Sequence, residues 1–192
     1  MRRAALLVVA LVCAAVALAF WQARDPLRDA PGGGFDLTAF FAGESVSAGT
    51  ITKALVSTQA FTAAFTGERQ GEAFRLEERF AFPDGERLQV WTLTGSADGR
   101  LAGTVETELE SGTMAEPVPV TGISDETGIV LDYDGVAPGG GMRLHFRHHM
   151  RMQDDGTVQN RVVVKKFGLP LATSEVTFAK DAAALPSLVR GR

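Results

Sequence analysis

The stretch that decides the fold is residues 74–93, FRLEERFAFPDGERLQVWTL. Its first half alternates apolar and polar residues with the period of two that is typical of a β-strand with one buried face. Pro83-Asp84-Gly85 then supplies a tight turn, because glycine tolerates the positive φ that such turns require. A second run leads to Trp91-Thr92-Leu93. The stretch therefore predicts an antiparallel hairpin.

The same pattern continues on both sides of this hairpin, with turn signals such as Asp98-Gly99 and Asp155-Gly156 between the runs. It predicts strands near 45–54, 56–66, 72–82, 86–95, 100–110, 114–121, 128–134, 141–153, 157–167 and 171–180. No long amphipathic helix separates them, so the fold class is all-β, an antiparallel up-and-down meander. Closure into a barrel or half-barrel removes unpaired edges and is favoured, with a β-sandwich as the alternative.

The N-terminal segment has a different character from the strands. Arg2 and Arg3 precede an apolar run at residues 4–21, the order found in a signal peptide or a membrane anchor. Ala17-Leu18-Ala19 suits signal peptidase, whereas the length of the run suits retention, so both alternatives stay open. Either one predicts a protein of the cell envelope, in the periplasm or at the periplasmic face of the inner membrane.

The chain divides into four predicted parts. Residues 1–23 are the signal peptide or anchor, 24–34 a flexible linker, 35–180 the β-barrel-like domain and 181–192 a C-terminal tail. At the start of the domain, Asp36 is expected to cap a short helix over residues 37–42, which Gly43 ends.

Charge and cysteine content exclude several classes of protein. The 192 residues carry a net charge of −4, and residues 24–192 hold 17 basic and 23 acidic residues, which argues against a nucleic-acid partner. The single cysteine, Cys13, excludes an intramolecular disulfide and a multi-cysteine metal site. It is either an apolar residue of the N-terminal run or, less in keeping with its neighbours, a lipidated cysteine.

Two polar residues interrupt apolar faces that should point into the barrel. Glu78 shares a face with large apolar side chains, so its carboxyl group must be paired, hydrogen-bonded or protonated. His148 interrupts the apolar face of the strand at 142–152. We expect His148 to be an interior or pocket-lining histidine, with Glu78 as a candidate partner, that titrates near neutral pH.

The opposite face of the strand at 142–152 is entirely basic. This basic stripe consists of Arg143, His145, Arg147, His149 and Arg151. It would either contact anionic headgroups or a partner, or pair across strands with the acidic stripe Glu106, Glu108 and Glu110. A metal site is not expected, because His145 and His149 lie about 13 Å apart along a strand and His148 faces the other way. No cofactor is expected.

Several short motifs between Phe35 and Lys180 resemble a bacterial envelope family of unknown function, domain of unknown function 3833. They are Phe35-Asp36-Leu37, the segment 76–86 followed by Trp91, Asn160-Arg161, Lys166-Phe167-Gly168 and the terminal segment 176–180. The resemblance implies an envelope barrel reminiscent of lipocalins, many of its members being predicted lipoproteins, and it implies no assigned activity.

The chain departs from the family pattern at two places. Gln89 stands where the pattern has an arginine, and Arg147-His148-His149-Met150 stands where it has Asp-Asp-Trp-Met. If those groups serve a shared activity, this chain has altered it.

These observations predict an exported, membrane-associated barrel that binds a hydrophobic or amphipathic small molecule, lipid-like in character. The expected ligand-binding residues are Glu78 and His148 for a polar head, Phe80, Trp91 and Phe146 with Phe74 and Phe82 as apolar wall, and Arg161 as a weaker candidate. No catalytic residue is assigned. The alternatives are a scaffold that docks an envelope partner through its basic stripe, and an enzyme acting on a lipid-like substrate.

Overall fold

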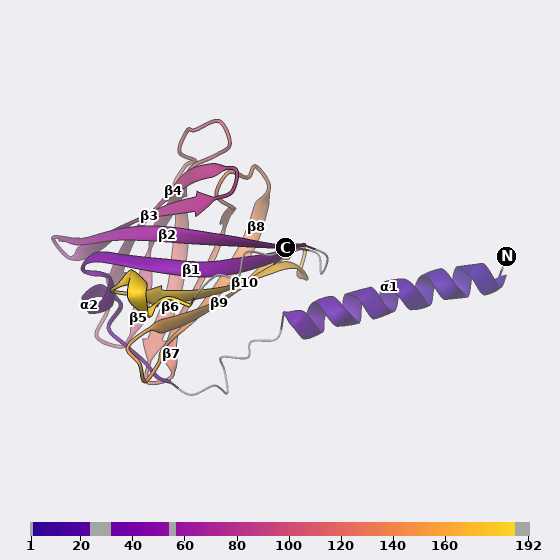
Figure 1. Cartoon of the computed structure of the whole chain (residues 1–192), viewed down its shortest axis with the longest axis horizontal. Coiled ribbons are helices and arrows are strands. Elements are labelled where there is room, and N and C mark those ends of the chain that lie inside the picture. The colour runs from indigo at the N-terminus through magenta and orange to yellow at the C-terminus, as the bar shows by residue number, and fades with distance from the viewer. Residues whose placement is uncertain (1, 24–31, 54–56, 187–192) are drawn as a thin grey trace.

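The computed structural model describes residues 2–23, 32–53 and 57–186 (Figure 1). Helix α1 spans Arg2–Gln22 and helix α2 spans Leu37–Phe41. The strands are β1 (Gly43–Lys53), β2 (Ser57–Gln70), β3 (Ala73–Phe82), β4 (Gly85–Gly95), β5 (Arg100–Thr107), β6 (Val118–Asp125), β7 (Gly128–Val136), β8 (Arg143–Met152), β9 (Val158–Lys166) and β10 (Leu169–Ala179). A short 3₁₀ helix, η2, follows at Ala182–Ala184.

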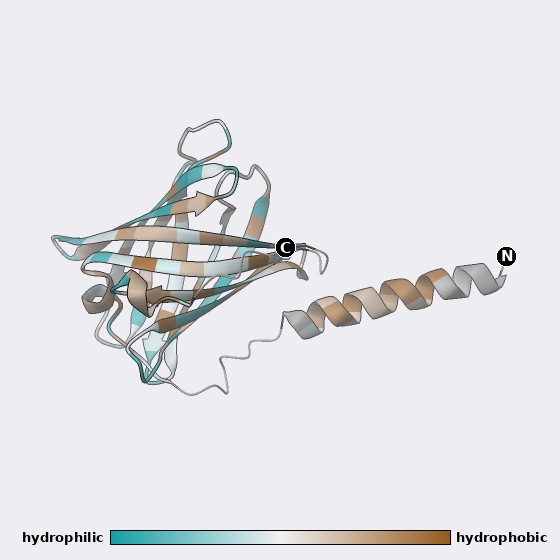
Figure 2. Ribbon diagram, in the orientation of Figure 1, coloured by the Kyte–Doolittle hydropathy of each residue, from teal (hydrophilic) through white to brown (hydrophobic). Residues whose placement is uncertain are grey.

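The ten strands form one closed barrel in the order β1-β10-β9-β8-β7-β6-β5-β4-β3-β2. Each strand pairs antiparallel with its sequence neighbours, and β1 closes the barrel against β10 from Val46↔Ala179 to Lys53↔Ala172. The all-β meander is therefore confirmed, and of the predicted alternatives it is the barrel, not the half-barrel or sandwich. Figure 2 shows the alternation of polar and apolar residues along these strands.

Several strand boundaries differ from the prediction, among them the end of β2, which extends to Gln70, and the bounds of β5 and β6. The strand expected near 100–110 is shorter, because β5 ends at Thr107, and the strand expected near 114–121 is shifted along the chain, because β6 spans Val118–Asp125. Between them the N–H of Leu109 donates to the carbonyl of Thr113 in a tight loop. Pro117, which has no N–H to donate to a ladder, then delays the next strand.

Helix α2 closes one end of the barrel. Its predicted cap is confirmed, since Oδ1 of Asp36 accepts hydrogen bonds from the N–H groups of Thr38 at 2.8 Å and Ala39 at 3.0 Å. Those bonds hold the pKa of Asp36 below its usual value. Inside the barrel the ring of Phe41 contacts Phe65 and Phe178, with centroids 5.5 and 5.3 Å apart. The helix thus acts as an apolar plug.

The predicted N-terminal segment is helical as α1, and its described side chains are largely exposed and apolar (Figure 2). No helix of the described residues has the length and hydropathy that a membrane-spanning helix requires. Most of the predicted linker, residues 24–31, and the end of the predicted tail, 187–192, lie outside the described residues. Where the chain is described again, Gly33 pairs with Met152 at the end of β8.

Candidate functional site

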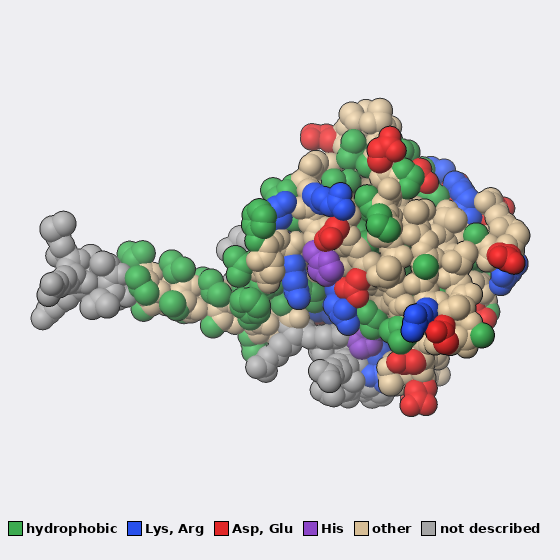
Figure 3. Space-filling view, turned by 180° about the vertical axis from the view of Figure 1, so that it is seen from behind, with side chains coloured by type: hydrophobic (Ala, Val, Ile, Leu, Met, Phe, Trp, Pro, Cys, Tyr) green, Lys and Arg blue, Asp and Glu red, His purple; other side chains and the backbone are tan. Residues whose placement is uncertain are grey.

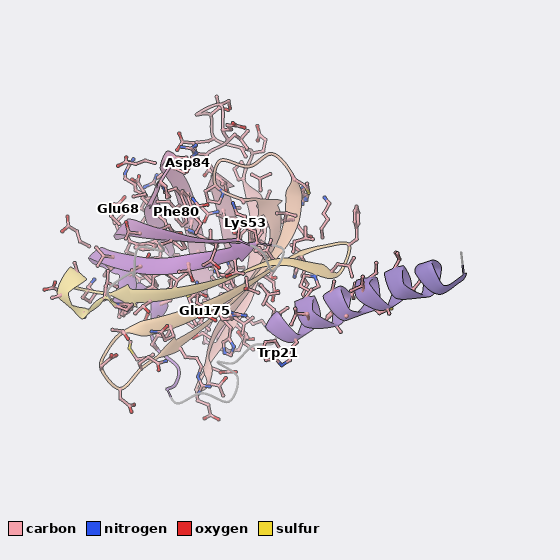
Figure 4. The ribbon with its side chains drawn as sticks, turned by 45° about the vertical axis from the view of Figure 1, so that its right-hand side comes forward. Trp21, Lys53, Glu68, Phe80, Asp84 and Glu175 are labelled. Carbon is pink, nitrogen blue, oxygen red and sulfur yellow. The ribbon has the colours of Figure 1, made fainter. Side chains whose placement is uncertain are left out.

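The barrel encloses a cavity of about 640 Å³ whose lining is mainly apolar. Leu37 and Phe41 of the α2 plug form its floor. At the opposite end its lining includes Lys53, Asp84 and Gly139, which lie at or beside the hairpin connections. The cavity therefore opens at the end where β1, β3 and β7 finish, and Figure 4 labels Lys53 and Asp84 at this rim, with Phe80 near them.

A ring of polar and aromatic side chains crosses the middle of this cavity. We call it the polar layer, and it consists of Glu78 on β3, Gln89 and Trp91 on β4, Tyr133 on β7, His148 on β8 and Asn160 on β9. Each of these residues places a polar atom on the inward face of its strand, where the other side chains are mainly apolar. Apolar side chains lie on both sides of the layer, with Leu76 and Leu93 toward the plug and Phe80 toward the mouth.

Glu78 is an uncharged carboxylic acid at neutral pH. Its side chain is 8% exposed, and Nε1 of Trp91 donates a hydrogen bond to its Oε2 at 3.3 Å. Burial raises the pKa of Glu78 to about 8, and the bond from Trp91 opposes the rise only in part. Because an indole N–H can only donate, the protonated carboxyl group keeps its own O–H available.

His148 is neutral for the same physical reason. Burial lowers its pKa to about 4, so the expectation that it titrates near neutral pH is wrong. Its Nδ1 lies 3.3 Å from Nδ2 of Asn160. An amide N–H donates, so Nδ1 accepts and the imidazole carries its proton on Nε2. Among the described residues, Nε2 of His148 and Oδ1 of Asn160 have no hydrogen-bond partner, although both are buried.

Gln89 and Tyr133, the other two members of the layer, have hydrogen-bond partners. Nε2 of Gln89 donates to Oγ1 of Thr107 at 2.8 Å, and Gln89 also hydrogen-bonds Tyr133. Burial raises the pKa of Tyr133, so its hydroxyl stays protonated. The rings form a contact triangle, with Trp91 5.3 Å from Tyr133 and 5.6 Å from His148, and Tyr133 5.8 Å from His148. His148 thus contacts Trp91, which holds Glu78, instead of forming the expected direct pair.

Five of the six predicted ligand-binding residues line the cavity: Phe80, Phe146, Glu78, Trp91 and His148. Phe82 also lines it, whereas Phe74 is buried beside the plug. Arg161 is not in the lining. Its neighbours Asn160 and Val162 point inward, so Arg161 points outward, where it forms an ion pair with Glu175 of β10.

Gln89, Tyr133 and Asn160 belong to the layer but were not among the predicted site residues. Each interrupts an apolar alternation, as Asn160 does between Val158 and Val162. The same signal that identifies Glu78 could have found them.

The basic stripe on β8 does pair across strands, but not with the predicted acids. Strand β8 lies between β7 and β9, whereas Glu106 lies on β5, which pairs with β4 and β6. Arg147 instead contacts Asp132 of β7 at 2.7 Å, and His145 contacts Asp134 at 3.2 Å. On the face in Figure 3, acidic, basic and histidine side chains accordingly lie interspersed.

Comparison with known structures agrees with this architecture. The S-type phycobiliprotein lyase CPES from Guillardia theta is similar at a TM-score of 0.51 and 11% identity, over 73% of this chain and 88% of that chain. This likeness shows the fold alone, a lipocalin-like barrel. A "putative thioesterase II" from Thermobifida fusca YX matches with a TM-score of 0.25 and 10% identity, over 82% of this chain and 90% of that chain, which supports no argument.

No curated protein matches the chain. A family model, described as a protein of unknown function (DUF3833), matches residues 13–180, which includes the plug, all ten strands and the whole polar layer. That match covers most of the chain and agrees with the motifs found between Phe35 and Lys180. The chain therefore belongs to the DUF3833 family.

Proposed function

We propose that this barrel binds a lipid-like molecule whose polar group is uncharged and reaches the polar layer, with its apolar part lying toward the mouth. The observation that carries the proposal is the pair of unpartnered buried atoms, Nε2 of His148 and Oδ1 of Asn160, in an otherwise apolar cavity. An unpaired buried polar atom costs about 1–3 kcal/mol. A ligand that accepts from Nε2–H and donates to Oδ1 removes that cost.

The charge state of the layer selects an uncharged group. At pH 7 Glu78 is protonated and His148 is neutral, so the layer offers hydrogen-bond donors and acceptors without a counter-ion. The cations that line the cavity, Lys53 and Arg87, lie at its mouth. A hydroxyl or amide group, which can both donate and accept, therefore fits the layer, whereas a carboxylate would be buried without a counter-ion. The volume suits one small ligand, since such pockets span about 300–1,000 Å³.

We also propose that the protein is exported and associates with a membrane through residues 1–23. The support is the order of Arg2 and Arg3 before an apolar helix, with α1 presenting exposed apolar side chains. A fusion of the whole chain to alkaline phosphatase, which is active only after export, tests the location. An inactive fusion that is present in the cytoplasm overturns it.

Displacement of a fluorescent probe tests the ligand class. The full chain, loaded with 1-aminoanthracene, is titrated with hexadecanol and with palmitate, which differ in the charge of the head. We expect hexadecanol to displace the probe at a concentration about tenfold lower. Equal displacement, or stronger displacement by palmitate, contradicts the uncharged head. Native mass spectrometry of the purified chain then identifies any lipid that co-purifies.

Two matched variants test the cavity itself. Ala172 lines the cavity, whereas Ala81 points outward from β3 and is exposed. Ala172→Phe should abolish binding of 1-aminoanthracene, because the new ring occupies the cavity, and Ala81→Phe should leave it unchanged. If both variants bind the probe as the parent does, the probe binds elsewhere and the proposed function fails.

A further inference from the structure

The exposed apolar side chains of the barrel gather at its open end. Within residues 32–53 and 57–186 the exposed large apolar residues are Met114, Ile123, Met142, Phe167, Leu169 and Leu171. All except Ile123 lie in or beside the connections at the mouth. Four of them form what we call the apolar rim. Met142 lies in the connection before β8, Phe167 in the connection between β9 and β10, and Leu169 and Leu171 at the start of β10. The two connections touch, since Nζ of Lys166 donates to the carbonyl of Arg143 at 2.6 Å.

Phe167 is placed where neither packing nor backbone preference explains it. Its side chain is 93% exposed, and it adopts φ 51°, followed by Gly168 at φ 78°. Lys166 pairs with Leu169, so Phe167 and Gly168 between them form a two-residue hairpin turn in which both φ values are positive. Such turns favour Asn-Gly, because a bulky side chain is strained at positive φ. The turn therefore holds an exposed phenyl ring at a conformational cost.

Leu171 connects the apolar rim to the cavity. The register of β9 and β10 shifts between Pro170 and Ala172, which leaves Leu171 as the extra residue of a β-bulge. A bulge redirects a side chain at a strand end. Leu171 is 41% exposed and also lines the cavity, so apolar surface continues from the exterior of the rim into the mouth.

The charges around the mouth are divided between its two sides. Lys53, Arg143, Lys165 and Lys166 lie on the side formed by β1, β8, β9 and β10, which also carries the apolar rim. The opposite side is mainly acidic, with Asp84, Glu86, Glu110 and Glu116, and its cation Arg87 pairs with Asp84 at 4.0 Å. An exposed apolar cluster bordered by cations fits a lipid surface with anionic headgroups, where each Lys or Arg near the surface is attracted. The chain as a whole has a net charge of −4, so this cluster of cations is a local feature of the mouth.

We propose that the apolar rim inserts into the surface of an anionic lipid bilayer, so that the cavity mouth opens onto the lipid from which a ligand enters. The insertion deepens the proposed lipid-binding function, on which it rests. Helix α1 is consistent with it, because α1 contacts β10 and lies on the side toward which β1 runs in Figure 1.

Site-specific fluorescence on the full chain tests the insertion. In a Cys13→Ser background, Phe167→Cys carries the environment-sensitive dye nitrobenzoxadiazole, and Ile123→Cys, at the plugged end, carries the same dye as the matched control. Each is bound to vesicles of phosphatidylcholine with phosphatidylglycerol. We expect dye at position 167 to shift its emission to the blue and to be quenched by doxyl-labelled lipid, and dye at position 123 to show neither change.

The outcomes separate the two proposals. No shift at either position overturns the insertion and assigns the rim to a protein partner, while equal shifts overturn the end-on orientation. An identical shift on vesicles of phosphatidylcholine alone overturns the role of the cations. Ala172→Phe in the labelled background should leave the shift unchanged, since insertion needs no bound ligand. Failure of insertion would leave displacement of 1-aminoanthracene intact, and failure of ligand binding would leave the dye shift intact.

Discussion

Trp91 donates its indole N–H to Oε2 of Glu78 over 3.3 Å, from the strand adjacent to that of the acid. The bond satisfies one carboxyl oxygen without supplying a positive charge. Glu78 therefore stays protonated in the interior, where a cation in place of Trp91 would have ionised it. Together with the neutral imidazole of His148, this arrangement gives the cavity polar atoms without net charge.

The two buried groups make the pH dependence of stability asymmetric. The pKa of Glu78 is raised from 4.5 to about 8 by folding, so its contribution is complete below pH 4.5 and is lost as the pH rises to 8. The pKa of His148 is lowered from 6.5 to about 4, so its contribution is complete above pH 6.5 and is lost as the pH falls to 4. The two slopes oppose each other between pH 4.5 and 6.5. Urea unfolding should therefore show a plateau there and a loss of about 2 kcal/mol between pH 6.5 and 8.

Glu78→Gln is the control for that loss, because an amide of the same shape does not titrate. We expect the decline between pH 6.5 and 8 to disappear in this variant, while the acid limb from His148 stays. A decline that persists in Glu78→Gln would show that another group causes it.

Trp91→Phe removes the hydrogen bond that opposes the rise in the pKa of Glu78. The pKa should therefore move further above 8, and the loss of stability on raising the pH should continue to a higher pH than in the parent and be larger in total. The variant should also lose about 1–2 kcal/mol of unfolding free energy at pH 6 through the missing bond. Carboxyl ¹³C chemical shifts of Glu78 across the pH range measure the first effect. An unchanged or lower pKa would contradict the bond as the relevant contact.

Gly67→Ala should displace the plug. A Cβ at Gly67 would lie 2.1 Å from the carbonyl oxygen of Phe41 and 2.6 Å from the ring of Phe74, so α2 must move away from β2. We expect a loss of unfolding free energy at the upper end of the about 1–3 kcal/mol that overpacking costs. Gly141→Ala is the matched control, because nothing lies within 4 Å of its Cβ. Similar urea midpoints for the two variants would show that the plug tolerates displacement.

Local patterns predict which face of a strand a residue occupies, and so they placed Glu78, His148 and the apolar walls correctly. They do not predict which strands become neighbours, since that depends on closure of the whole sheet. For this reason the sequence offers Glu106, Glu108 and Glu110 as possible partners of the basic stripe, whereas in the structure Arg147 pairs with Asp132. Arg161 does not reach the cavity because side chains alternate between the two faces of a strand, and its neighbour Asn160 on β9 faces inward. The pKa of His148 depends on burial from several strands at once, which no single strand encodes.

Phe167→Asn should stabilise the barrel. Asparagine accepts the positive φ of this turn position, whereas phenylalanine there is strained, and the 93% exposed ring loses little packing on removal. We expect a gain of about 1 kcal/mol in the free energy of urea unfolding. Phe167→Val is the contrasting variant, because a β-branched residue is strained at positive φ, and it should give no gain. A loss of stability in Phe167→Asn would show that the ring supports the fold. A gain would show that the ring does not stabilise the barrel, as expected if it contacts a surface outside the protein.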